Sequence, residues 1–317
     1  MPDIVTLTMN PALDITTSTG RVMPTSKIRC DAPRRDPGGG GVNVARVLQV
    51  LGRPATAVFP SGGHCGRALE DLVATEGVAL RTVTIRGSTR ESFTINEEST
   101  GLQYRFVLPG PVLTAIEQQS CLELLARVAR DAVFVVAGGS LPPGVPVDFY
   151  QRVADLVAPL GARLIVDTSG PALRQLRRGI YLVKPSIREL REWVGQELPT
   201  RADQVAAART LIGDGVCTVL ALSLGADGAL LVTADEEEHF PSVDVDVVSG
   251  VGAGDSMVAG ITFGLSCGWA LRDAMRYGIA AGAAMLRTPG TAPCLRSDVE
   301  LFYSQLAGAG SAVPGAG

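Results

Sequence analysis

Apolar residues gather along the chain in short solid runs that alternate with longer amphipathic segments. The short runs do not alternate with polar residues, which is typical of strands buried on both faces. They predict strands at Val5–Met9, Thr56–Phe59, Ala132–Ala137, Arg163–Val166, Ile180–Val183, Thr218–Ser223 and Ala229–Val232. Helices are predicted between them at Val42–Leu51, Gly66–Glu76, Ala115–Arg130, Val147–Ala158 and Gln204–Gly213. This alternation predicts an α/β fold, with a mostly parallel central sheet and helices on both of its faces.

Two segments break the alternation. Residues 16–36 mix polar, apolar and charged positions, and residues 89–108 have the pattern of a hairpin with a turn near Glu98–Gly101. Because long structureless loops are uncommon in compact domains, we expect both to be lid segments, strands of a small accessory sheet that covers a cleft. Such a sheet could also join two subunits edge to edge. The alternative is a pair of long surface loops.

Composition narrows the class of protein. The chain has 317 residues, 46% of them hydrophobic, which is enough for a large core, and its net charge of −4 comes without any run of Lys or Arg. A nucleic-acid partner is therefore not indicated. No signal peptide and no apolar run of the ~18 residues needed for a membrane span is present. The six cysteines, with no C-x-x-C pair, indicate reduced thiols in a cytoplasmic enzyme, and the two histidines alone cannot form a metal cluster.

Domain organisation follows from the absence of any internal repeat or linker-like stretch. We expect a single domain over residues 1–308, with the lid segments inserted in it. The small residues and proline of 309–317 predict a disordered tail.

One glycine-rich turn carries the strongest chemical signal. A β-type run at Val243–Val248 leads into three glycines between residues 250 and 254, and an apolar helix follows at Ser256–Leu265. Glycines permit a tight turn, and the free N–H groups of a helix N-terminus then form a site for an anion such as a phosphoryl group. Asp255 lies at the mouth of this turn and is suited to take a proton from an attacking hydroxyl. The alternative is an ordinary turn with a helix-capping aspartate.

A second glycine cluster, G-G-G-G at 38–41, runs into an amphipathic helix. Backbone without side chains can approach a small polar ligand closely, and Asn43 has donor and acceptor groups for hydroxyls. A dinucleotide-binding loop requires G-x-G-x-x-G directly after the first strand, whereas these glycines come some thirty residues after it. We therefore discount dinucleotide binding.

Charged residues near these turns suit a phosphorylated sugar. Asp14 follows the first strand, where we expect the carboxyl edge of the sheet, and can accept hydrogen bonds from hydroxyls. Lys27, Arg90 and Arg105 all fall in the lid segments, and arginine can bind phosphate through two parallel hydrogen bonds. Taken singly, Asp14 is equally typical of a turn cap and each cation of a solvated surface.

Three more turns are expected at the same edge of the sheet. They are G-G-S-L-P-P-G at 138–144, K-P-S-I-R-E at 184–189 and S-L-G-A-D-G-A at 223–229. In the second, Glu189 lies in the first turn of a helix, where a carboxylate either caps the helix or holds the water shell of Mg²⁺. Ordinary turn chemistry is the alternative for all three.

Five stretches match a known family: T-L-T-M-N-P-A-L-D at 6–14, G-G-G-G-V-N-V-A-R at 38–46, G-S-L-P-P-G at 139–144, S-L-G-A-D-G-A at 223–229 and V-G-A-G-D-S-M at 251–257. Through them the chain resembles the PfkB (ribokinase-like) carbohydrate kinases from end to end. K-I-R-C at 27–30, T-R-E-S-F at 89–93 and Q-Y-R-F-V-L-P-G at 103–110 make it most similar to the type II 6-phosphofructokinases. The resemblance implies a three-layer α/β/α sandwich with a small β lid.

The resemblance also implies a role for each matching position. Asp255 would be the catalytic base, and an anion hole would be formed by the N–H groups of Gly252, Ala253 and Gly254. The sugar phosphate would be held by Asp14, Lys27, Gly39, Gly40, Asn43, Arg90, Arg105 and Ser140. The ATP site would include Lys184, Ser186, Ser223, Gly225 and Gly228. Glu189 would help to place Mg²⁺, and K⁺ would be bound by the backbone carbonyls of Ser249, Val251, Met285, Thr288 and Gly290.

Two positions depart from the family pattern. Ser186 stands where an asparagine is usual, in an N-x-x-E pattern, and Ser249-Gly250 stands where Asp-Thr is common. The first puts a contact with Mg²⁺ and phosphate in doubt, and the second loosens the cation loop. Neither touches Asp255 or its glycines, so activity is still expected.

These observations predict an ATP-dependent, Mg²⁺-requiring kinase that phosphorylates the C1 hydroxyl of fructose 6-phosphate. Alternatives within the class are tagatose 6-phosphate or fructose 1-phosphate as the substrate, because the sequence does not settle sugar stereochemistry. A different class, a catalytically weak sensor of sugar phosphate or ATP, is favoured only by Ser186. A homodimer joined through the lid is expected.

Overall fold

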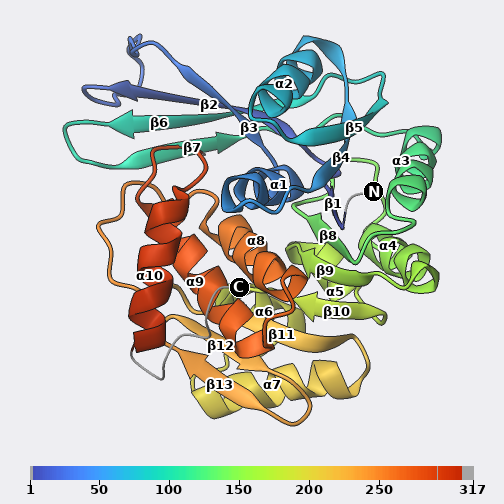
Figure 1. Ribbon diagram of the computed structural model, residues 1–317. Helices are drawn as coiled ribbons and strands as arrows, with labels where there is room; N and C mark the ends of the chain where they lie inside the picture. The colour runs from blue at the N-terminus through green and yellow to red at the C-terminus, as the bar shows by residue number, and fades with distance from the viewer. Residues whose placement is uncertain (1–2, 291, 309–317) are drawn as a thin grey trace.

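The structure, a computed structural model that describes residues 3–290 and 292–308, is built around one large twisted sheet (Figure 1). Its strands follow the order β13-β12-β11-β10-β9-β8-β1-β4-β5. The pairs from β11 to β5 are all parallel, whereas β12 and β13 run antiparallel at one edge. The bounds are β1 Ile4–Leu7, β4 Thr56–Ser61, β5 Ala79–Thr84, β8 Phe134–Gly138, β9 Arg163–Asp167, β10 Ile180–Val183, β11 Cys217–Ser223, β12 Ala229–Val232 and β13 Glu237–Phe240. The predicted mostly parallel sheet is confirmed.

Helices cover both faces of this sheet, which gives the predicted three layers. One face packs against α1 Gly40–Leu51, α2 Gly63–Thr75, α8 Ala253–Ser266, α9 Leu271–Leu286 and α10 Arg296–Gly308. The other packs against α3 Ala115–Val128, α4 Phe149–Val157, α5 Gly170–Arg174, α6 Ile187–Val194 and α7 Arg201–Gly213. Each face of the sheet has its own hydrophobic core, and successive residues of a strand point alternately into one core and the other. Ile4 belongs to the first, and Val5 and Leu7 belong to the second.

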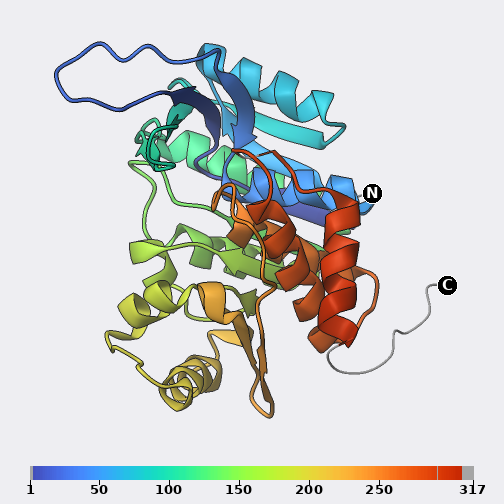
Figure 2. The same cartoon turned by 90° about the vertical axis from the view of Figure 1, so that its left-hand side faces the viewer.

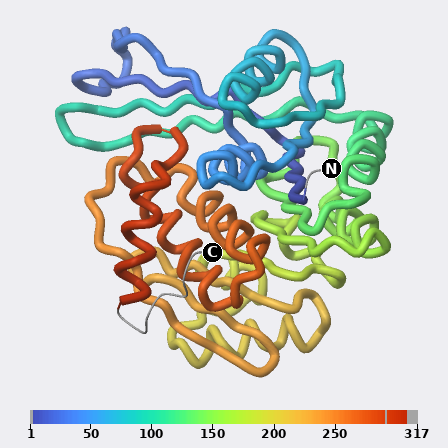
Figure 3. Tube along the Cα trace, in the orientation of Figure 1, coloured from blue at the N-terminus to red at the C-terminus, as the bar shows by residue number. Residues whose placement is uncertain are grey.

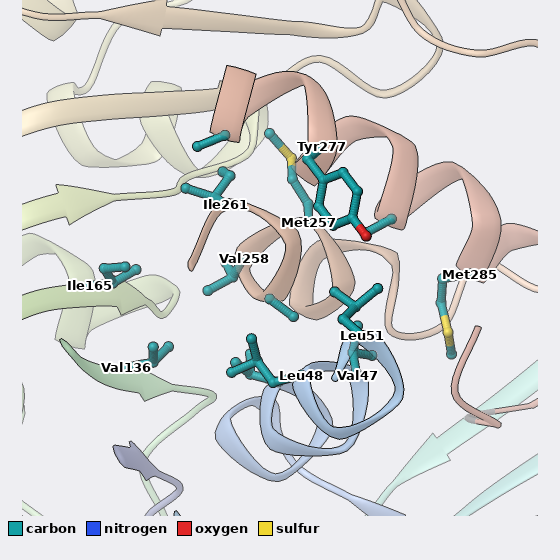
Figure 4. Packing of buried hydrophobic residues seen from close by; sticks show 14 of the residues in the cluster. Val47, Leu48, Leu51, Val136, Ile165, Met257, Val258, Ile261, Tyr277 and Met285 are labelled. Carbon is teal, nitrogen blue, oxygen red and sulfur yellow. The ribbon is translucent and has the colours of Figure 1, made fainter. Parts of the chain in front are cut away.

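Helix α8 is held in a fixed position by close packing. Leu48 and Leu51 of α1 lie near Val258 of α8 in the buried cluster of Figure 4, and all three are fully buried. On its other side α8 meets α9 so closely that a Cβ at Gly260 would lie 2.7 Å from the Cα of Gly278. Burial of each large apolar side chain here stabilises the fold by about 1.5–3 kcal/mol. The N-terminus of α8 is therefore a rigid platform at the carboxyl edge of the sheet.

The lid segments form a second, four-stranded sheet in the order β3-β2-β6-β7. Its strands are β2 Ala12–Thr19, β3 Arg34–Gly38, β6 Arg90–Glu97 and β7 Gln103–Val107, at the top of Figures 1 and 3. The loop over residues 20–33 projects away from the body in Figure 2 and contains no strand. The accessory sheet is thus confirmed, while the middle of the first lid segment is the surface loop that was the alternative.

Several expectations from the sequence were wrong or incomplete. Residues 243–248 were predicted as a β-type run but pair with no strand. Val243 and Val245 pack against the buried cluster on one face of the sheet, and with Val247 they line a pocket. Asp14 lies within β2 of the lid sheet and not at the edge of the central sheet. Strands β5 and β13 and helices α9 and α10 were not predicted. The predicted disordered tail, 309–317, lies outside the described residues.

Candidate active site

The glycine-rich turn at residues 250–254 lies at the N-terminus of α8, as predicted. We call this turn, with the free N–H groups of the first turn of α8, the cup. Gly252 is the N-cap residue and has a φ of 79°, in the left-handed region that glycine adopts without strain. Since α8 begins at Ala253, the N–H groups of its first turn have no acceptor within the helix and point out of its positive end. Asp255 lies in that first turn. The structure therefore places an anion site and a carboxylate side by side.

The carboxylate of Asp255 has an unusual environment. Burial, together with the nearby carboxylate of Asp167, raises the pKa of Asp255 to about 7. A hydrogen bond of 2.8 Å from Nδ2 of Asn43 to its Oδ2 acts in the opposite direction, as does the charge of Lys184. A carboxyl group with a pKa near neutrality is well matched to accept a proton from a hydroxyl.

A charged pocket opens on one side of Asp255, between the lid sheet and the two glycine turns. It encloses about 220 Å³. Its walls include the predicted residues Asp14, Gly39, Gly40, Asn43, Arg90, Arg105, Val251, Gly252, Asp255 and Gly290, together with Thr16, Ser92, Phe93, Thr94, Val107 and Gly139. The glycines are required at this wall, since a Cβ on Gly40 would lie 2.7 Å from the backbone N of Gly139. We call this space the sugar pocket.

Opposite charges face each other in the sugar pocket. Burial raises the pKa of Asp14 to about 6, although the cations Arg90 and Arg105 lower it. The guanidinium of Arg90 donates to the carbonyl of Asn10 and to Oγ of Ser92, which fixes its position. The pocket thus combines a hydroxyl acceptor with two cations, as the sequence predicted.

Two predicted residues do not line this pocket. Lys27 is exposed in the loop over 20–33 and is not among the residues that line the pocket. Ser140 lies beside the pocket, where its Oγ accepts a hydrogen bond of 3.2 Å from Nδ2 of Asn10. Of the three predicted cations, Arg90 and Arg105 line the pocket and Lys27 does not.

An apolar pocket of about 660 Å³ opens on the other side of the cup. The predicted residues Ser223, Gly225 and Gly228 line it with Ala253 and Gly254 of α8. The rest of its wall comes from Ala226, Ala229, Ser242, Val243, Asp244, Val245, Val247, Met257, Ile279, Gly282, Ala283 and Leu286. We call this space the nucleotide pocket, because it is a mostly apolar volume that reaches the anion site at Ala253 and Gly254.

A buried ion pair stands beside the cup. Nζ of Lys184 lies 3.3 Å from Oδ1 of Asp167, and a Cβ on Gly254 would lie 3.5 Å from the same Nζ. Burial raises the pKa of Asp167, while the carboxylates of Asp167 and Glu189 more than offset the effect of burial on Lys184 and raise its pKa. The ammonium is therefore available to a transferred phosphoryl group. Lys184 was predicted, whereas Asp167 was missed, although an acid directly after the apolar run of β9 was a usable signal.

Ser186 and Glu189 form a capping box at the start of α6. Oγ of Ser186 accepts from the N–H of Glu189 at 3.3 Å, and Oε2 of Glu189 accepts from the N–H of Ser186 at 2.8 Å. The helix-capping alternative for Glu189 is thus observed. Its second carboxylate oxygen has no role in the cap, so the cap does not exclude a role near Mg²⁺.

The backbone segments expected to hold K⁺ lie together. The N–H groups of Val248 and Ser249 donate to the carbonyl of Leu286 at 2.8 and 3.1 Å, which joins the two loops. The carbonyl of Met285 already accepts hydrogen bonds from both N and Oγ1 of Thr288. Of the five carbonyls predicted to bind K⁺, that of Met285 is therefore already hydrogen-bonded and is less available to a cation. In the part of the chain that the structure describes, no group of three or more His, Cys, Asp or Glu could hold a metal, and no helix could span a membrane.

Comparison with known proteins agrees with this geometry. Residues 7–298 match the family described as "pfkB family carbohydrate kinase". The chain is 58% identical over 302 residues to the "ATP-dependent 6-phosphofructokinase isozyme 2" of Mycobacterium tuberculosis, covering 95% of this chain and 89% of that protein.

Solved structures show the same similarity. The crystal structure of phosphofructokinase-2 from Escherichia coli in complex with potassium superposes with a TM-score of 0.92 at 39% identity. The structure of that protein in complex with fructose 6-phosphate gives a TM-score of 0.90 at 38% identity. Each match covers 97% of this chain and the whole of the other. The chain belongs to the pfkB family of carbohydrate kinases, enzymes that transfer a phosphoryl group to an alcohol.

Proposed function

We propose that this protein transfers the γ-phosphoryl group of ATP to the C1 hydroxyl of fructose 6-phosphate. The observation that carries the proposal is the position of Asp255, which lies in the first turn of α8 between the sugar pocket and the nucleotide pocket. A hydroxyl in the first pocket and a triphosphate in the second would meet at the cup of N–H groups. The similarity to 6-phosphofructokinases supports the choice of substrate.

The chain's own groups suit such a transfer. Asp255 would take the hydroxyl proton, while the N–H groups of residues 252–254 and the ammonium of Lys184 would stabilise the charge on the moving phosphoryl group. Arg90 and Arg105 would hold the 6-phosphate, and Asp14 and Asn43 the hydroxyls. Positioning and charge neutralisation account for most of the catalysis in reactions of this kind.

Mg²⁺ and K⁺ are proposed as the metal requirements. The free oxygen of Glu189 would act on Mg²⁺ through water, and bound Mg²⁺ would neutralise charge on the phosphates of ATP. The carbonyls of the loops at 249–251 and 285–290 would hold K⁺ beside the anion site. The crystal structure of the Escherichia coli protein with potassium supports this part of the proposal.

A homodimer formed through the lid is also proposed. β7 is an edge strand of the lid sheet, and around it Leu102, Phe106, Val107 and Leu108 are 43–61% exposed. An apolar edge strand invites pairing with a second copy of the chain. Analytical ultracentrifugation at micromolar concentration tests this, and a monomer alone would count against it.

The six free cysteines of the chain support a cytoplasmic location.

A coupled assay of ADP release tests the function. Purified protein with ATP and Mg²⁺ is presented with fructose 6-phosphate, tagatose 6-phosphate, fructose 1-phosphate and fructose. We expect the highest kcat/KM with fructose 6-phosphate. A higher kcat/KM with another sugar would mean that this other sugar is the preferred substrate. Binding of all four sugars without turnover would mean that the protein is a sensor and not an enzyme.

A further inference from the structure

Behind the sugar pocket lies a buried arginine, Arg46, which is not among the residues that line the pocket. Arg46 of α1 has a side chain that is 2% exposed, and its Nε and Nη2 each donate 2.6 Å hydrogen bonds to the carboxylate of Glu76, where α2 ends. A buried guanidinium is costly unless its charge is paired, and this two-fold contact with Glu76 provides the pair. The ion pair therefore fixes the direction in which the remaining nitrogen of Arg46 points.

That remaining nitrogen contacts both ends of the glycine turn. Nη1 of Arg46 donates to the carbonyl of Pro37 at 2.9 Å and to Oδ1 of Asn43 at 3.5 Å. The other end of the same amide, Nδ2 of Asn43, donates to Oδ2 of Asp255 at 2.8 Å. A continuous chain of contacts therefore runs from Glu76 through Arg46 and Asn43 to Asp255.

We propose that Arg46, anchored by Glu76, is a positioning residue that sets the orientation of the Asn43 amide and thereby keeps Asp255 ready to act as a base. An asparagine amide can turn over and exchange its donor and acceptor. With Arg46 donating to Oδ1, only the orientation with the NH₂ group toward Asp255 satisfies both neighbours. The opposite orientation would set an amide oxygen against a carboxylate and an NH₂ group against a guanidinium.

The consequence is a control on proton transfer. The hydrogen bond from Asn43 favours the ionised form of Asp255, and it opposes burial and the charges of Asp167 and Asp14, while Lys184 acts in the same sense as Asn43. Loss of Arg46 would let the amide turn and would raise the pKa of Asp255. The base would then be protonated over a wider range of pH, and turnover would fall on the acid side.

Arg46→Lys and Glu76→Gln test the proposal, with Arg53→Lys as the matched control. Arg53 follows α1 and pairs with Asp3 and the carbonyl of Ser266, away from Asn43. We expect Arg46→Lys to move the acid limb of the kcat profile upward by about one pH unit, since a hydrogen bond to a charged group and a pKa unit are of similar size. Glu76→Gln should move it less in the same direction, and Arg53→Lys not at all.

A second readout separates this inference from the proposed function, on which it rests. Protein labelled with ¹³C at aspartate carboxyl groups is titrated by NMR, and the Asp255 signal is identified by its loss in Asp255→Asn. The upward shift should appear there even if fructose 6-phosphate is not the substrate. If Arg46→Lys does not fold, Glu76→Gln alone decides. Unchanged titration of Asp255 in a folded variant, with a loss of melting temperature only, would show that Arg46 is merely structural.

Discussion

The sugar pocket and the nucleotide pocket share one wall, the turn at residues 252–255, yet they are lined by different kinds of residue. The sugar pocket presents charged and amide side chains held by hydrogen bonds, such as Asn43 to Asp255 and Arg90 to Asn10. The nucleotide pocket presents mainly glycine, alanine and valine. Directional contacts discriminate strongly between ligands, whereas apolar walls discriminate weakly. The difference implies that specificity lies on the sugar side and that tolerance lies on the nucleotide side.

The largest expected effect comes from the shared wall. Asp255→Asn keeps the size of the side chain but removes the proton acceptor, so kcat should fall by about 10²- to 10⁴-fold. Affinity for an ATP analogue, measured by calorimetry, should stay nearly unchanged, because the nucleotide pocket keeps its walls. A variant with close to full turnover would show that Asp255 is not the base.

A smaller loss is expected from the cation side of the sugar pocket. Arg105→Ala removes a donor that we propose binds the 6-phosphate, so the KM for fructose 6-phosphate should rise by about 10- to 100-fold, as expected for hydrogen bonds to a charged group. The KM for ATP should not change. Arg81→Ala, on exposed positions of β5, is the control and should affect neither. An equal rise in both KM values would mean that the two pockets are not independent.

Exchange of the purine should have a smaller effect still. Ser242, one of the few polar side chains of the nucleotide pocket, already donates its Oγ hydrogen to the carbonyl of Ala226 at 2.6 Å. Inosine triphosphate, in which an oxygen replaces the 6-amino group, should therefore lower kcat/KM by no more than about tenfold, far less than the loss of a hydrogen-bonded group costs at a polar site. A 10³-fold preference for ATP over inosine triphosphate in steady-state assays would refute the inference that the nucleotide pocket is the more tolerant of the two.

The sequence predicted the polar pocket better than the apolar one, for a physical reason. Tight turns need glycine at positions such as Gly252, and few charged residues lie near these turns. Both the glycines and the charged residues can therefore be recognised in the sequence. The wall at 243–247 is rich in valine, and this composition predicts a β-type run. Composition does not tell whether a neighbouring strand is present for it to pair with. An acid at the end of β9 was visible in the sequence, but the ion pair of Asp167 with Lys184 joins two segments of the chain, and no local pattern contains that contact.

The pH dependence of folding offers the finest test of the difference between the pockets. Asp255 titrates at about 3.8 as an ordinary aspartate and at about 7 in the folded protein, and Asp14 is raised in the same direction to about 6. Between these values the folded state holds protons that the unfolded state releases. The contribution of these two groups to stability is therefore fully present at acid pH and is lost as pH rises through their folded pKa values. Both groups line the sugar pocket, so the cost arises there.

Asp255→Asn should therefore unfold at a higher temperature than the unmodified protein above pH 7, by a difference on the order of 1 kcal/mol in unfolding free energy. The gap should narrow as pH falls from 7 and should close below about pH 4, where the carboxyl group becomes neutral in the unfolded state as well. Asp203 is the matched contrast, because its hydrogen bonds with Thr200 lower its pKa, so that Asp203→Asn should lower stability at neutral pH. Thermal melts without ligands between pH 4 and 8 measure both. A gap for Asp255→Asn that is independent of pH would mean that packing, and not the buried charge, separates the variant from the original chain.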